Sequence, residues 1–458
     1  MSQLRIGESA TSDVPGASEA QAQQESQRAA AEGGVGSLFK ERDAKDAFGP
    51  DYSYQRIRIH KKDEVNPYAA EQDARYGLDG RAKVAIALGV ALVIVYLLAC
   101  ILPTNVFSAE RADRTLGTLA AETATAFQGL IGFFANPDTM YGTYVLTVLV
   151  TLLAGAAMGL SGGVFQGALK NALASPSTLG VTSGGSIGAI IYAVFLMPSE
   201  SSYGFVGTYD ELVTMQSQLS PVQQIVEEFG SFIASMCGCF LIVALIMVIA
   251  FIAGRGKVSN VSLVIAGQVF AAVIAVVLNW IRLYLTNHGD PEAALYLAQA
   301  QTMTFMGAYT PLTVLVFAIP LLVCMACIFV LSKRLSLLAF NDDEARSMGI
   351  SPVRLRNVMV ALCTVMTALV VSFCGPVGFV GFLVPHMARK MVGPDFRYLL
   401  PVCALLGALM VTAIFYVAQL GIPYVSAGGT GVLTSLVGCI AFIIIALRGR
   451  RSAGGEWL

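Results

Sequence analysis

Long runs of apolar residues alternate with short polar segments along most of the chain. A helix needs about 20 apolar residues to cross a hydrocarbon core, and ten runs are candidates for such crossings. The eighth is the weakest, because it is only about a dozen residues long and contains Pro385. The pattern predicts an all-α, polytopic membrane protein with about ten transmembrane helices. The runs are 82–102, 143–160, 179–197, 230–253, 261–285, 312–331, 353–373, 378–388, 399–420 and 429–447.

Lys and Arg residues flank these runs in a regular way. They gather before the first run and after the fourth, sixth, eighth and tenth, whereas the loops after the third and ninth contain none. Basic flanks mark the cytoplasmic side of a membrane protein. With ten crossings, every basic cluster falls on the same face, so we expect both termini in the cytoplasm. An odd number of crossings would scatter the clusters to both sides.

A short polar insert, 341–350, separates the sixth and seventh runs and is too polar to cross a bilayer. Asn341, Asp342 or Asp343 can cap a helix there, and Gly349 followed by Pro352 is a plausible stop. The insert therefore predicts a helix of one or two turns at the membrane surface, on the cytoplasmic side. Because so short a helix is marginal alone, its order should come from docking against a partner.

Three stretches of sequence resemble the FecCD-type permeases. They are L-S-G-G-V-F-Q-G-A-L-K-N-A-L-A-S-P-S-T-L-G-V-T-S-G from Leu160, E-A-R-S-M-G-I from Glu344, and G-P-V-G-F-V-G-F-L-V-P-H-M-A-R from Gly375. The similarity runs from about Ala82 to Arg451 in one order, and the residues before Ala82 lie outside it.

The resemblance implies the membrane subunit of a type II ABC importer for iron-siderophores, haem or cobalamin. Such a permease is expected to work as a homodimer with two ABC ATPase subunits and an extracellular substrate-binding protein or lipoprotein. The chain contains no Walker A motif, so ATP hydrolysis is expected on a separate subunit. We expect a transport subunit in the cell membrane, not an enzyme, with no cofactor of its own.

The resemblance also makes the polar insert the coupling helix that sits in a cleft of the ATPase. An ordinary surface turn between two helices is the alternative interpretation. Replacing Arg346 or Gly349 is expected to uncouple ATP hydrolysis from uptake. The positions that match the family pattern are Glu344, Ala345, Arg346, Ser347, Met348 and Gly349.

Polar residues inside apolar runs tend to face a partner helix or a cavity. Gln268 and Asn279 in the fifth run are eleven residues apart, close to three helical turns, which places them on one face. The resemblance makes this run a wall of the translocation pathway at a two-fold axis; interhelical hydrogen bonding is an equal alternative. His386 is expected to be structural, because no other His or carboxylate accompanies it at metal-ligand spacing.

Basic residues on the outer face are the candidates for docking the binding protein. The resemblance implies that arginines of the permease pair with acidic residues of that protein, but the family's usual R-x-P-R run is replaced here by N-P-D-T-M-Y-G-T-Y. Arg111, Arg114 and Arg282 remain as candidates. The acidic segment 199–228 either adds contacts or is simply solvated.

Composition separates the chain into three parts. Residues 1–80 are rich in Ala, Gln, Glu, Ser and Gly and are expected to form a disordered cytoplasmic extension. The permease domain follows at 81–451, and 452–458 is a short tail. A basic cluster at 56–62 is either solvated or contacts anionic lipid. Small residues crowd 161–188, which favours close helix packing over a phosphate-binding loop.

Overall composition excludes several classes of function. The chain is 55% hydrophobic and 13% charged, with a mean hydropathy of +0.68 and a net charge of −1, so it is not a soluble domain and nucleic-acid binding gains no support. The nine cysteines are scattered, and Cys324 and Cys327 are expected to be packing residues. A secondary transporter driven by an ion gradient is the alternative function, although carboxylates are missing from the middle of the runs. The sequence does not distinguish among the three cargoes.

Overall fold

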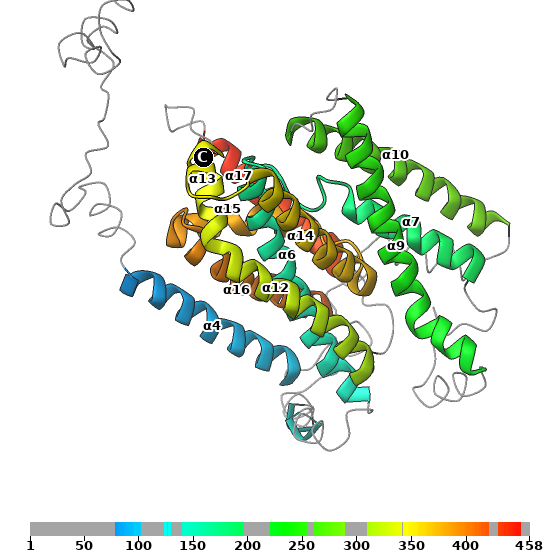
Figure 1. The fold of residues 1–458 in the computed structure, drawn as a ribbon. Coiled ribbons are helices and arrows are strands. Elements are labelled where there is room, and N and C mark those ends of the chain that lie inside the picture. Colours follow the sequence, from blue (N-terminus) through cyan, green and yellow to red (C-terminus); the bar gives the residue numbers. More distant parts are fainter. Residues whose placement is uncertain are drawn as a thin grey trace, which may run out of the picture. The chain divides into compact units, whose positions relative to one another are not determined.

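The computed structural model describes residues 78–101, 123–125, 127–129, 140–196, 220–253, 260–288, 309–340, 342–420 and 429–449. The chain divides into two units, Met1–Ala70 and Glu71–Leu458, and every described residue belongs to the second. Regular structure within these ranges is helical throughout (Figure 1). The all-α prediction is therefore confirmed.

Each of the ten predicted runs coincides with a helix. The helices are α4 (Leu78–Ile101), α6 (Met140–Ala168), α7 (Val181–Ile191) with the π-helical turn η2 (Tyr192–Leu196), α9 (Pro221–Ala253), α10 (Asn260–Asn287), α12 (Pro311–Phe340), α13 (Asp342–Ser347), α14 (Pro352–Cys374), α15 (Val380–Val392), α16 (Phe396–Gln419) and α17 (Gly429–Gly449). Within the described part of the chain, seven helices are long and apolar enough to cross a membrane: α4, α6, α9, α10, α12, α14 and α16. The apolar stretches of α7 and α17 are shorter, and the number of crossings stays a prediction.

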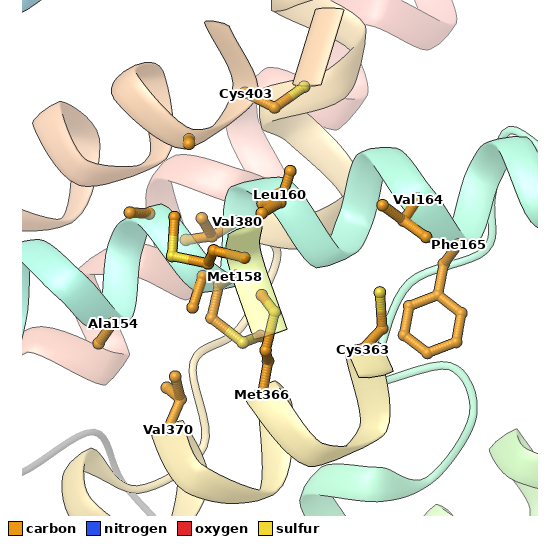
Figure 2. Packing of buried hydrophobic residues seen from close by; sticks show 14 of the residues in the cluster. Ala154, Met158, Leu160, Val164, Phe165, Cys363, Met366, Val370, Val380 and Cys403 are labelled. Carbon is orange, nitrogen blue, oxygen red and sulfur yellow. The ribbon is translucent and has the colours of Figure 1, made fainter. Parts of the chain in front are cut away.

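Helix α6 lies at the centre of the main hydrophobic core, against α12, α14, α15 and α16. In the most apolar stretch of α6, 78% is buried, compared with 11% in that of α10. The high value is expected for a helix that other helices surround. Figure 2 shows the contact at close range, with side chains of α6 facing those of α14 and α16. The labelled residues are Ala154, Met158, Leu160, Val164 and Phe165 of α6, Cys363, Met366 and Val370 of α14, Val380 of α15 and Cys403 of α16.

Glycines allow α6 to approach its neighbours closely. A Cβ added at Gly155 would lie 2.5 Å from the carbonyl oxygen of Gly407 in α16, and one at Gly162 would overlap the carbonyl of Gly381 in α15. Helices attract one another weakly in lipid, so such backbone contact is a main source of their association. The close packing that the small residues predict is confirmed.

Helices α7, α9 and α10 pack together and form the green group in Figure 1. Glycines again mark the contacts: a Cβ at Gly184 of α7 would lie 2.6 Å from the Gly238 carbonyl oxygen of α9. Phe232 of α9 and Phe373 of α14, with ring centroids 4.6 Å apart, connect this group to the rest of the bundle.

Three helices extend beyond the apolar runs that predicted them. Helix α6 continues beyond Leu160 to Ala168, because close packing offsets the cost of about 1 kcal/mol that each interior glycine carries. Helix α12 continues past Lys333 and Arg334 to Phe340, since no helix breaker intervenes and the helix extends beyond its apolar part. Helix α9 begins at Pro221, within the segment predicted as an acidic loop, and proline suits a first helical turn.

Several expectations concern residues outside the described ranges. These include the part of the extension that precedes Leu78, the basic cluster at 56–62, and most of the acidic segment 199–228.

Candidate functional site

The polar insert between α12 and α14 forms the short helix α13, which spans Asp342 to Ser347. Gly349 ends it in the left-handed conformation, with φ of +75°. The Ile350 N–H donates to the Ala345 carbonyl and the Gly349 N–H to the Arg346 carbonyl, each at 2.9 Å. This pair of hydrogen bonds is the Schellman motif, in which glycine avoids the steric cost of positive φ. The predicted helix and its stop at Gly349 are confirmed.

Two basic side chains anchor the first residue of α13. Lys170, just beyond the end of α6, places its Nζ 2.8 Å from Oδ1 of Asp342. Arg356, the fifth residue of α14, lies 3.3 Å from Oδ2 of the same carboxylate. Arg356 Nε also donates to the carbonyl of Ala168, the last residue of α6, at 2.8 Å. We call Lys170, Asp342 and Arg356 the anchor cluster.

The anchor cluster keeps Asp342 ionised. The hydrogen bond from Lys170 lowers the pKa of this carboxyl; partial desolvation opposes that effect, and the positive charge of Arg356 reinforces it. The three side chains are 21–34% exposed, so the pairs are only partly screened by solvent. A six-residue helix would be marginal alone, and this cluster supplies tertiary contacts that order it.

The predicted coupling residues divide between two sides of α13. Ala345 is fully buried and faces the bundle. Ser347 and Gly349 are exposed, as are Met348, at 65%, and the side chain of Arg346, at 64%. For Glu344 only the helical backbone is described. We call Arg346, Ser347, Met348 and Gly349 the exposed edge of α13.

The exposed edge has a charged part and an apolar part. Arg346 pairs with Asp343 at 3.3 Å, but Asp343 is 82% exposed, and such surface pairs contribute about 0–1 kcal/mol. Met348 presents a flexible, polarisable side chain, which adapts readily to an opposing surface. The arrangement can therefore bind a partner without first breaking a strong internal contact.

The predicted pathway residues Gln268 and Asn279 lie on α10, and both are exposed. The buried side of α10 carries Gly267, Ile274 and Leu278 instead. Within the described part of a single chain, neither polar side chain is thus buried against a neighbouring helix. Their exposure leaves a cavity, a second copy or lipid as the environment they face.

Of the predicted docking arginines, only Arg282 is described. It is exposed near the end of α10, where its carbonyl accepts a hydrogen bond from Thr286 Oγ1 at 2.9 Å. Arg111 and Arg114 lie outside the described ranges. Docking of a binding protein by these three residues stays a prediction.

His386 lies on α15, where its ring packs on Phe382 with centroids 4.7 Å apart. Its Nδ1 donates to the Phe382 carbonyl at 3.1 Å. Among the described residues, no three or more His, Cys, Asp or Glu side chains lie together in a way that could hold a metal ion.

The anchor cluster is the part of the site that sequence reasoning missed. Lys170 was visible as a charge within the small-residue segment 161–188, and Arg356 as one near the start of the seventh run. Each charge lies at the end of a helix that the topology places on the same face as the polar insert. The shared position of these charges and the polar insert on one face was the signal from which the anchor cluster could have been predicted.

The fold and the site together define a multi-pass helical membrane protein. Its short surface helix, α13, is connected by ion pairs to the end of α6 and to α14. The chain belongs to the FecCD transport family, whose model matches residues 114–448.

Individual relatives match parts of the chain. The protein named Probable siderophore transport system permease protein YfiZ, from Bacillus subtilis, is 32% identical over 43% of this chain. The cobalamin import permease BtuC of Halobacterium salinarum is 35% identical over 27%. This chain covers only 57% and 33% of the length of those two relatives. The vitamin B12 import permease BtuC of Escherichia coli is 28% identical over 66% of this chain and 82% of its own length.

A solved structure shares the fold. It is described as an inward-facing conformation of a proposed metal-chelate type ABC transporter, and it superposes with a TM-score of 0.59 at 22% identity. The match covers 80% of this chain and 99% of the other. The similarity confirms the predicted permease architecture.

Proposed function

We propose that this chain is the membrane-spanning permease subunit of an ATP-binding-cassette importer. It moves a metal chelate from an extracellular binding protein into the cytoplasm. An iron-siderophore is the first candidate for this chelate and cobalamin is the second. It acts as a homodimer with two separate ATPase subunits. The observation that carries the proposal is the exposed edge of α13, which is held in place by the anchor cluster in a chain of this family.

The geometry of α13 suits the transmission of force from an ATPase. The anchor cluster holds one end of α13 and the Schellman motif defines the other, so a push on the exposed edge moves the helix as a unit. Met348 and Arg346 give the ATPase an apolar and a charged contact. A flexible loop would absorb the same push.

Contacts between helix ends support the proposed topology of ten crossings. Ends assigned to the cytoplasm meet one another: Lys170 meets Asp342, Ser336 Oγ donates to Asp395 at 3.0 Å, and the Arg81 guanidinium lies 4.6 Å from the ring centre of Tyr398.

Ends assigned to the outside also meet. Tyr144 donates to the Ala99 carbonyl at 2.9 Å, and Tyr309 donates to the Phe373 carbonyl at 2.6 Å. Each of these five contacts pairs residues that the topology places on one side. The first three contacts support one common side for α13, the C-terminal ends of α6 and α12, and the N-terminal end of α4. We place this side, and with it both termini, in the cytoplasm.

The choice of cargo follows the relatives. The names of the matched proteins give siderophore, ferric dicitrate and cobalamin transport. These names give no support to haem, the third cargo considered. Large chelates of this kind suit a pathway lined mostly by apolar helices, with Gln268 and Asn279 as its polar residues.

Uptake by the reconstituted complex tests the proposal. The chain, its cognate ATPase and the binding protein would be placed in liposomes and given a radiolabelled ferric siderophore, or labelled cobalamin in a parallel assay. We expect accumulation that requires ATP and is abolished by vanadate. Accumulation that follows an imposed ion gradient without ATP would instead establish a secondary transporter. A liposome with the ATPase alone is the control.

A further inference from the structure

Lys170 holds an unusual backbone conformation at the end of α6. Its φ is +48°, one of two positive values among the described non-glycine residues. Its N–H donates to the Gly167 carbonyl at 3.4 Å, and the Asn171 N–H donates to the Gln166 carbonyl at 3.2 Å. Lys170 therefore occupies the position of a Schellman motif that glycine usually fills. An L-residue is strained there because its Cβ approaches the following carbonyl.

The side chain of Lys170 shows what this strained position provides. A glycine would end α6 equally well, but it could not reach Asp342, which Lys170 contacts at 2.8 Å. Arg356 approaches the same carboxylate from α14 and also binds the end of α6 at Ala168. The first residue of α13 is thus tied to the last turn of α6 from both sides.

Through the anchor cluster, α13 reaches the most enclosed helix of the bundle. The direct packing of α13 is against α12 and α14. Its connection to α6 instead runs through the charges of the anchor cluster. Glycines bring the backbone of α6 into direct contact with α15 and α16, so we expect the three helices to move together. A displacement of Asp342 therefore pulls on the core.

We infer that Lys170, Asp342 and Arg356 are positioning residues through which α13 transmits the movement of the ATPase to α6. The inference rests on the proposed function, since it presumes that an ATPase moves α13. It assigns a separate step, however: the exposed edge of α13 binds the ATPase, and the anchor cluster passes the resulting movement to the bundle.

The Lys170→Gly variant separates transmission from folding. Glycine removes the ion pair with Asp342 but relieves the positive φ. These two effects oppose each other, so the thermal unfolding temperature of the purified chain should change little. The amount of substrate imported per ATP hydrolysed should nevertheless fall about fivefold or more, which is the lower end of usual coupling effects. Crosslinking of Ser347→Cys to the ATPase should be unchanged, because the exposed edge remains intact.

Two further variants complete the test. Lys170→Arg keeps the positive charge and should retain most of the import per ATP. Asp343→Asn removes one charge from the same helix, but from an 82% exposed side chain outside the cluster, so it should behave like the wild type. Asp342→Asn should resemble Lys170→Gly in transport even if its stability differs.

Each result supports or overturns one specific claim. Wild-type import per ATP in Lys170→Gly, or equal losses in Asp343→Asn and Lys170→Gly, would overturn the role of the anchor cluster. Loss of ATPase crosslinking in Lys170→Gly would also overturn it, because binding and transmission would then not be separate. If the wild-type complex shows no ATP-dependent uptake, the proposed function fails first.

Discussion

At the scale of single residues, the carboxylate of Asp342 joins three helices. It lies at the start of α13 and receives positive charge from the end of α6 and from the fifth residue of α14. Breaking one partner of such a cluster leaves the remaining charges poorly compensated, and that loss exceeds the net contribution of the pair itself. Asp343, one residue further along, is 82% exposed and makes an ion pair that solvent screens.

The pKa of Asp342 gives a prediction for stability against pH. Because this pKa is lower in the folded protein than the unfolded value of about 3.9, the carboxylate stabilises the fold fully above that pH. The contribution is lost as the pH falls through the lower folded value. Asp342→Asn should therefore unfold at a lower temperature than the wild type at pH 7.

Thermal unfolding in detergent between about pH 3 and 8 checks this prediction. The gap between wild type and Asp342→Asn should be constant from about pH 5 upward and should shrink below about pH 4. Asp343→Asn is the matched control and should show little difference at any pH. A gap at pH 3 as large as that at pH 7 would contradict the role given to the ionised carboxylate.

At the scale of elements, apolar runs predicted the helices well and their ends poorly. Most of the runs are long enough to cross the hydrocarbon core, where backbone groups find no water to bond and a helix satisfies them internally. The ends depend on packing: α6 continues through its glycines because Gly381 and Gly407 lie against them. The stop of α13 could be predicted because a glycine with positive φ is a local signal. The anchor cluster could not, since Lys170 and Asp342 meet only in the folded chain.

The glycines of α6 make a prediction at this scale. In Gly162→Ala the new Cβ would overlap the backbone carbonyl of Gly381, and backbone cannot rotate away as a side chain can. We expect a loss of about 1–3 kcal/mol in the free energy of unfolding, the usual cost of overpacking. Gly89→Ala on α4 is the control, because its Cβ would meet nothing within 4 Å.

Thermal or chemical unfolding of the purified variants in detergent measures both effects. Gly89→Ala should be unchanged or slightly more stable, because alanine is the better helix former by about 1 kcal/mol. Equal stability of the two variants would show that α6 and α15 can separate without cost. The transmission of movement from α13 into the core would then lose its structural basis.

At the scale of the whole molecule, the proposed function depends on which side of the membrane α13 occupies. The basic flanks predict that α13 lies in the cytoplasm, and the contacts between helix ends agree with the topology on which that prediction rests. The C-terminal end of α10 should then lie outside the cell. Ser347 on α13 and His288 just beyond α10 are both exposed, so they form a matched pair of reporters.

Cysteine labelling in intact cells decides between the two orientations. The exposed native residues Cys237, Cys327 and Cys439 would first be replaced by serine, and Ser347→Cys and His288→Cys introduced separately. A membrane-impermeant maleimide should label His288→Cys in intact cells, and should label Ser347→Cys only after the membrane is opened. This order follows because, in the ten-crossing topology, a single crossing, that of α12, separates the two positions and so places them on opposite faces. Labelling of Ser347→Cys from outside would put α13 beyond the reach of any ATPase, and the importer proposal would fail with it.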